Sequence, residues 1–217
     1  MTEGTARRKT GRVLAAAAVL GLAAGVGAVY VTGGFSGNSA AEAPCGGAER
    51  AVARMAEAAT GEVAAFTVER NPVAAPDLSF RDGEGRERRL SQFRGRAVLL
   101  NLWATWCAPC RQEMPALDRL QAELGGPNFE VVPISIDLGD AARPRAFYRD
   151  ARIERLSFYQ DPSGRVFQEL RTAGRAVGMP TTVLIDAQGC ILGHLSGPAE
   201  WASGDALRLV RAALGAS

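Results

Sequence analysis

The clearest pattern in the chain is an apolar run followed at once by helical spacing. Residues 97–103, AVLLNLW, have one polar interruption, Asn101, and their length suits a strand that is covered on both faces of a sheet. After Thr105, apolar side chains recur three and four residues apart, ending with the leucines of residues 117–124. We therefore predict a buried strand that leads into a helix, which ends at the Gly-Gly-Pro stretch of residues 125–127.

Other stretches predict the rest of an α/β fold. Residues 129–136, FEVVPISI, are typical of a second buried strand, so the two strands and the helix between them form a βαβ unit. The remaining predicted elements are a helix at 49–59, an extended segment at 62–70, two short strands within 77–90, a helix at 144–152, a strand at 157–160, a helix at 166–171, a hairpin of 182–185 with 191–195, and a helix at 205–214.

The N-terminal pattern predicts a membrane anchor. Residues 13–31 carry no charge and are long enough to span a bilayer, and a basic cluster in residues 1–12 precedes them. We expect residues 1–12 to be a cytoplasmic tail, residues 32–44 a flexible tether, and residues 45–217 an exported domain. The alternative is a secretory signal that is cleaved near residues 39–41. Either interpretation exports the domain into a compartment where disulfides persist.

Composition and charge narrow the function classes. The chain has 217 residues with 47% hydrophobic content, which is enough for one domain with a sizeable core. Without residues 1–12, 21 basic residues stand against 22 acidic ones, from totals of 25 and 23 less four and one. No basic stripe interrupts this balance, so we expect no nucleic-acid partner.

Two cysteines lie where the buried strand gives way to the helix. At a helix N-terminus, unpaired N–H groups and the helix dipole would stabilise Cys107 as a thiolate, and Cys110 lies one turn further on. We predict that Cys107 attacks client disulfides and that Cys110 resolves the mixed disulfide. Ala108 adds no charge and Pro109 has no N–H, so the thiolate is weakly stabilised and the dithiol favours reduction of other disulfides. The alternative is a purely structural disulfide.

The segments WCAPC (residues 106–110) and GMPT (residues 178–181) resemble the thioredoxin-like family. Within it, the closer resemblance is to the TlpA-type membrane-anchored thiol:disulfide interchange proteins, and it covers roughly Pro44 to the C-terminus. It implies a thioredoxin-like fold with a central mixed sheet flanked by helices, an N-terminal extension, and a TlpA-type insertion at about residues 144–171. It also implies a structural disulfide between Cys45 and Cys190.

The resemblance assigns further roles near the cysteines. Pro180 would be cis and pack against the active disulfide, which would leave the Met179 backbone free to pair with a client chain. The alternative is an ordinary proline at a strand edge. Glu113, one helical turn after Cys110, would accept the Cys110 proton, because Asn101 replaces the strand aspartate of plain thioredoxin. The alternative for Glu113 is a solvated helix residue.

The tryptophans and the single histidine are assigned from their surroundings in the sequence. We expect Trp106 on the contact surface around the sulfurs and Trp103 in the core. His194 is the only histidine, and on an extended strand it would lie about 13 Å from Cys190. That separation is too long for a shared metal, so we interpret His194 as structural or incidental.

Competing functions are less well supported. A Sco-type copper chaperone carries CxxxC with a distant histidine, a DsbA-type oxidant has histidine within CxxC, and a peroxidase would keep its reactive cysteine without the WCxxC pairing. A zinc site needs four clustered ligands, which the cysteine spacing does not suggest. We therefore expect no metal and no cofactor other than the Cys107–Cys110 disulfide.

The expected function is that of a membrane-anchored reductant, and the resemblance implies a bacterial inner membrane with the catalytic domain in the periplasm. The resemblance implies as clients a Sco-type copper chaperone and the copper-site cysteines of cytochrome oxidase, with electrons supplied by a membrane thiol reductant. The alternative clients are apocytochromes c, whose CxxCH cysteines must be reduced before haem attachment. We expect the protein to be a monomer.

Overall fold

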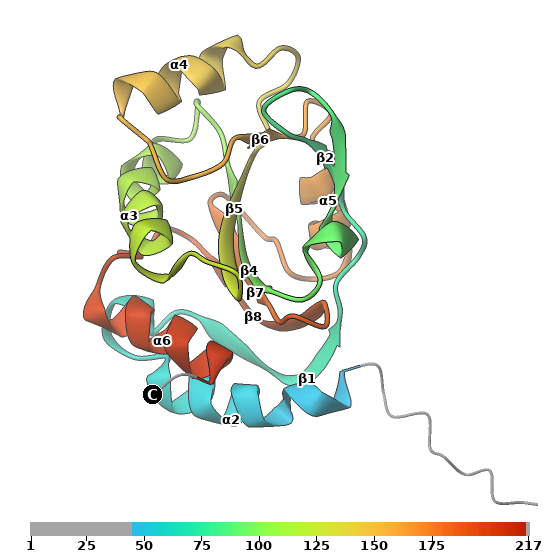
Figure 1. Cartoon of the computed structure of the whole chain (residues 1–217), viewed down its shortest axis with the longest axis vertical. Helices are drawn as coiled ribbons and strands as arrows, with labels where there is room; N and C mark the ends of the chain where they lie inside the picture. The colour runs from blue at the N-terminus through green and yellow to red at the C-terminus, as the bar shows by residue number, and fades with distance from the viewer. Residues whose placement is uncertain (1–44, 216–217) are drawn as a thin grey trace, which may run out of the picture. The chain divides into compact units, whose positions relative to one another are not determined.

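Strand β4 (Ala97–Trp103) lies in the middle of the sheet in the computed structural model, which describes residues 45–215. All seven residues of β4 are buried, as its apolar run predicts. It pairs in parallel with β5 (Phe129–Ser135) and in antiparallel fashion with β7 (Thr181–Ile185). Helix α3 (Ala108–Leu124) connects β4 to β5, so the predicted βαβ unit is confirmed (Figure 1).

The sheet is mixed and has eight strands in the order β1-β8-β7-β4-β5-β6-β2-β3. The pairs β4–β5 and β5–β6 are parallel, and the other neighbours are antiparallel. The outer strands are β1 (Thr67–Ala74), β8 (Cys190–Ser196), β6 (Tyr159–Gln160), β2 (Ser79–Arg81) and β3 (Glu87–Arg89). The predicted α/β fold with a central mixed sheet is thus confirmed.

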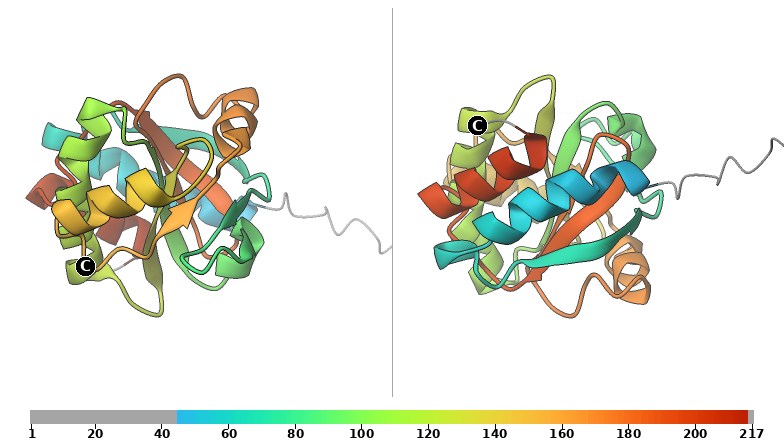
Figure 2. Two further views of the ribbon diagram at one scale, coloured as in Figure 1. Left: turned by 90° about the horizontal axis from the view of Figure 1, so that it is seen from above. Right: turned by 90° about the horizontal axis from the view of Figure 1, so that it is seen from below.

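Helices cover the sheet on both sides. Besides α3, they are α2 (Glu49–Ala58), α4 (Ala142–Asp150), α5 (Arg165–Thr172) and α6 (Gly204–Leu214), with short 3-10 turns η1 (Gly46–Ala48), η2 (Gly61–Val63) and η3 (Leu90–Phe93). Helices α3 and α5 lie on opposite sides of β4 and β5, and α2 runs beside α6 (Figures 1 and 2). Arg54 of α2 donates from Nε to the Ala212 carbonyl of α6 at 2.8 Å. This hydrogen bond joins the first and last α-helices of the described residues.

The first predicted extended segment, residues 62–70, is wrong in its bounds. Residues 61–63 form η2, with Gly61 at a φ of +56° and Val63 fully buried, and β1 begins only at Thr67. It then runs beyond the predicted end and through Pro72. The register with β8 shifts between Val68 and Val73, and this irregularity accommodates a residue that has no N–H to donate.

The predicted cytoplasmic tail, membrane anchor and tether, residues 1–12, 13–31 and 32–44, lie outside the described residues. Between residues 45 and 215, no helix combines the length and the apolar character needed to span a bilayer.

Candidate active site

Cys107 occupies the N-cap of α3, four residues beyond the end of β4. Strand β4 ends at Trp103, a short loop containing Thr105 and Trp106 follows, and the helix begins at Ala108. Cys107 and Cys110 form a disulfide, and the Cys110 N–H donates to Cys107 Sγ at 3.3 Å. Cys107 is 6% exposed, whereas Cys110 is fully buried. Of the two sulfur atoms, Cys107 Sγ is thus the one that a client can reach first.

Asp137 anchors the loop that carries Cys107. It lies just beyond β5, is buried, and its carboxylate accepts from the Thr105 N–H at 2.9 Å and from the Thr105 hydroxyl. Ser135 donates to the same carboxylate from its hydroxyl at 2.9 Å. Sequence reasoning missed Asp137, although its place directly after a buried strand parallel to β4 was a usable signal, because the ends of neighbouring parallel strands meet at one edge.

The segment before β7 forms the other wall of the site. Thr181 pairs with Leu102 near the end of β4, so Pro180 lies at the same edge of the sheet as the cysteines. The Met179–Pro180 peptide bond is cis, and the Pro180 carbonyl accepts from the Gly197 N–H at 2.8 Å. Arg175 holds the start of this segment, because its Nε lies 2.9 Å from Glu69 Oε1 on β1.

Glu113 lies inside the protein and is not a solvated helix residue. It is 3% exposed, on α3 three residues after Cys110. Oε1 accepts from Asn101 Nδ2 at 2.7 Å, and Oε2 accepts from the Ala199 N–H and from Trp201 Nε1, each at 3.2 Å. Burial raises the pKa of Glu113 to about 7, against the opposing effect of these hydrogen bonds. A carboxyl with that pKa can both take up and release a proton near neutral pH.

The tryptophans take the positions that the sequence suggested. Trp106 is 64% exposed next to Cys107, while Trp103 is fully buried against Phe147 and Tyr148. Beside Trp106 lies a hollow of about 540 Å³. Its lining comprises Trp106, Asp137, Leu138, Gly139, Asp140, Ala142 and Arg143.

The other two cysteines lie toward the opposite end of the sheet from Pro180, because Ile191, next to Cys190, pairs with Ile185 at the end of β7. Cys45 and Cys190 form a disulfide, the pairing that the family resemblance implies. His194 Nδ1 lies 3.3 Å from Glu69 Oε1, and burial lowers the pKa of His194. Within residues 45–215, no three His, Cys, Asp or Glu side chains gather into a group that would hold a metal ion.

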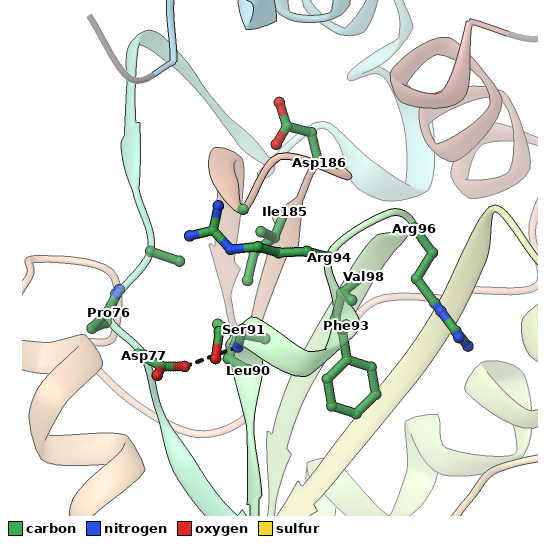
Figure 3. A pocket seen from close by; sticks show the side chains of 12 residues that line it. Pro76, Asp77, Leu90, Ser91, Phe93, Arg94, Arg96, Val98, Ile185 and Asp186 are labelled. Atoms are coloured by element: carbon green, nitrogen blue, oxygen red, sulfur yellow. Dashed lines mark hydrogen bonds between the residues drawn. The ribbon is translucent and has the colours of Figure 1, made fainter.

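A second hollow lies at the opposite end of the sheet (Figure 3). Val98 and Ile185, which pair at the start of β4 and the end of β7, contribute to its lining. Arg94 points across it and donates to the Gln188 carbonyl at 2.7 Å. Its volume of about 30 Å³ is far smaller than the 540 Å³ of the hollow beside Trp106, so we assign it no client and no cofactor.

Comparisons with known proteins agree with this geometry. The model of the AhpC/TSA family matches residues 73–193. Thioredoxin-like protein YneN of Bacillus subtilis is 34% identical over 119 residues, which are 54% of this chain and 66% of YneN. Thiol-disulfide oxidoreductase ResA of Bacillus cereus is 30% identical over 123 residues, 57% of this chain and 68% of ResA.

Solved structures extend the similarity to the fold. A Chlorobium tepidum protein assigned as thiol:disulfide interchange protein DsbE superposes with a TM-score of 0.54 at 31% identity, over 69% of this chain and 98% of its own. A thiol:disulfide interchange protein of the thioredoxin family from Chlorobium tepidum TLS gives a TM-score of 0.56 at 26% identity, over 68% and 99%. The fold is thioredoxin-like.

Proposed function

Because the chain belongs to the AhpC/TSA family and is a thioredoxin-like thiol-disulfide oxidoreductase, we propose that it reduces disulfides of client proteins outside the cytoplasm. The observation that carries this proposal is the Cys107–Cys110 disulfide at the N-terminus of α3, with the buried Glu113 one turn further along the same helix. This combination provides a nucleophile, a resolving thiol and a proton acceptor at one end of one helix.

The exchange proceeds in two steps. In the reduced protein, the Cys107 thiolate attacks one client sulfur, a mixed disulfide forms, and the second client sulfur leaves as a thiolate. Glu113 then accepts the Cys110 proton, and the Cys110 thiolate attacks Cys107 Sγ. The client leaves with both of its cysteines reduced, because it has gained two electrons. Cys107 and Cys110 have lost these two electrons and are joined in a disulfide. A membrane thiol reductant reverses these steps to restore the dithiol.

The direction of electron flow follows from the two residues between the cysteines. Ala108 contributes no positive charge, and Pro109 has no N–H to offer the Cys107 thiolate. A weakly stabilised dithiol releases its electrons readily. We expect a potential of roughly −210 to −270 mV, against about −120 mV for DsbA.

Exposed apolar side chains at this end of the sheet form a client-docking surface. Trp106, Leu138 and Val177 are 64%, 73% and 84% exposed, and among the described residues only Val73 is another exposed large hydrophobic. The first two line the hollow beside Trp106, and Val177 lies two residues before Met179. A client strand would lay an apolar side chain in the hollow and pair with the Met179 backbone.

The cellular setting is part of the same proposal. The basic tail, the apolar stretch of residues 13–31 and the tether support anchoring in a bacterial inner membrane, with the domain in the periplasm. We propose that the protein acts as a monomer. A buried disulfide far from the active site supports an oxidising compartment.

For clients we propose cysteine pairs that bind copper only when reduced, in a Sco-type chaperone and in the copper-binding subunit of cytochrome oxidase. The Cys45–Cys190 pairing supports the TlpA-type resemblance from which this choice comes. The second candidate is the CxxCH pair of apocytochrome c, since the relatives reported above are named for thiol-disulfide exchange and not for copper.

Equilibration with glutathione tests the reductant proposal. We expect the Cys107–Cys110 couple to equilibrate between roughly −210 and −270 mV. The Pro109→His variant should shift the potential toward DsbA's, because a cationic side chain stabilises the thiolate. A wild-type potential above about −150 mV would contradict the proposal.

Trapping identifies the clients. A Cys110→Ser variant should accumulate mixed disulfides through Cys107, and a Cys107→Ser variant of the same chain is the matched control. Capture of copper-site proteins supports the first choice. A deletion strain with a normal oxidase copper centre and no cytochrome c would instead establish the second candidate.

A further inference from the structure

The two oxygens of the Glu113 carboxyl have different partners. Oε2 accepts two hydrogen bonds, from the Ala199 N–H and from the Trp201 indole N–H, both at 3.2 Å. Both donors come from the turn between β8 and α6, and Trp201 is fully buried. Neither N–H can accept a hydrogen bond, so a proton on Oε2 would face two donor hydrogens. The oxygen available to a proton is therefore Oε1.

Oε1 faces a partner that can serve both protonation states. Asn101 Nδ2 donates to Oε1 at 2.7 Å and to Thr182 Oγ1 at 3.0 Å, while Asn101 Oδ1 is buried without a partner among the described residues. A half-turn of the amide would bring Oδ1 to these two contacts. It would then accept from protonated Glu113 and from the Thr182 hydroxyl, which can donate as well as accept.

We propose that Trp201 is a positioning residue for thiol-disulfide exchange. Its indole N–H and the Ala199 N–H both donate to Glu113 Oε2, so that the proton taken from Cys110 is held on Glu113 Oε1, facing Asn101. The inference rests on the proposed role of Glu113 as the acceptor of that proton. It assigns a function to the turn between β8 and α6, which lies 86 to 88 residues from Glu113 in the sequence.

Loss of the indole hydrogen bond has a measurable consequence. This bond favours the ionised carboxylate, so its removal raises the pKa of Glu113 further above its ordinary value. If the pKa of Glu113 rose by about one pH unit from about 7, the ionised fraction of this carboxyl at pH 7 would fall from about one half to about one tenth. The oxidation rate of the dithiol at that pH should fall about fivefold, and the rate should recover about one pH unit higher.

The test compares two tryptophans of the full chain. Trp201→Phe removes the indole N–H that donates to Glu113. Trp103→Phe is the control, because Trp103 is equally buried but its indole N–H has no partner among the described residues. We would follow oxidation of the reduced protein by glutathione disulfide from about pH 5 to 9, with alkylation and mass counting. Carboxyl infrared bands would report the Glu113 titration. Both midpoints should rise in Trp201→Phe and stay unchanged in Trp103→Phe.

A second measurement needs no change at Trp201. In the wild-type protein, the Trp201 indole N–H resonance should titrate with the Glu113 midpoint, the indole resonances of Trp103 and Trp106 should not, and Glu113→Gln should abolish the shift. Unchanged midpoints in Trp201→Phe, or an indole resonance that does not titrate, would overturn the inference. If Glu113→Gln left the rate profile itself unchanged, the proposed role of Glu113 would also be wrong, so the two failures are distinguishable.

Discussion

The buried carboxyl of Glu113 carries an electrostatic cost. The side chain is 3% exposed and no cation is among its hydrogen-bond partners, which are the Asn101 amide, the Trp201 indole and a backbone N–H. Burial therefore favours the neutral acid and raises the pKa to about 7 from 4.5. The protein gains a proton acceptor that works near neutral pH, and it loses stability wherever that acceptor is charged.

The cost should appear in the pH dependence of unfolding. Between about pH 4.5 and 7 the folded state binds more protons than the unfolded chain, so the free energy of unfolding falls as pH rises through this window. The shift corresponds to about 3 kcal/mol. We expect the stability of oxidised wild-type protein relative to Glu113→Gln to fall by about this amount between pH 4 and pH 8, in urea titrations. A difference that stays constant with pH would show that Glu113 titrates normally.

At the scale of elements, the site is the meeting point of three strand ends. The ends of β4 and β5 and the start of β7 lie at one edge of the sheet. Asp137 beyond β5 fixes the loop before Cys107, and the ion pair of Arg175 with Glu69 fixes the segment before Pro180. Each wall of the site is thus held by a polar contact with a distant segment, and the sulfurs stay in place between them.

We expect Asp137→Asn to loosen the loop that carries Cys107. The variant loses the charge that accepts from Thr105, which should cost about 1–3 kcal/mol and speed amide exchange at residues 104–107. The matched control is Asp186→Asn, because Asp186 accepts from the Gln188 and Cys190 N–H groups in a turn at the other end of the sheet. Hydrogen exchange with mass spectrometry separates the two. Equal protection of residues 104–107 in wild type and Asp137→Asn would contradict the anchoring role.

The sequence predicted the elements better than the contacts between them. The βαβ unit, the hairpin of β7 and β8 and the closing helix follow from local apolar spacing, which the fold preserves. The first strand was misplaced because Gly61 and Pro72 act through backbone geometry and sheet register, which apolar spacing does not encode. The partners of Glu113 were missed for a related reason. Ala199 and Trp201 lie 86 and 88 residues after Glu113 in the sequence, and only the folded sheet brings them to it.

At the scale of the whole molecule, the N-terminal segment is held by contacts with the last third of the chain. Cys45 is joined to Cys190 at the start of β8, and the Glu62 N–H donates to Asp205 Oδ2 at 3.0 Å. Arg54 reaches the Ala212 carbonyl from α2. If residues 13–31 form the proposed anchor, these contacts connect the catalytic sheet to the segment that leads to the membrane.

The Cys45–Cys190 disulfide should therefore contribute to stability and not to chemistry. It closes a loop with a sequence separation of 145, and chain entropy gives up to ~5 kcal/mol for such a loop. We expect the Cys45→Ser, Cys190→Ser double variant to unfold at lower urea, with α2 losing protection first, while its rate of dithiol oxidation by glutathione disulfide stays at the wild-type value.

The matched control is the Cys107→Ser, Cys110→Ser double variant. Its lost bond has a sequence separation of 3, for which the same entropy model gives only about 2 kcal/mol. That variant should retain most of its stability and lose all exchange activity. The opposite ranking of stabilities would contradict a stabilising role for the Cys45–Cys190 disulfide. A slowed exchange rate in the Cys45→Ser, Cys190→Ser protein would show that this disulfide also affects the chemistry. With the expected ranking, a reducing partner can cycle Cys107 and Cys110 while the buried second disulfide holds the N-terminal helix to the sheet.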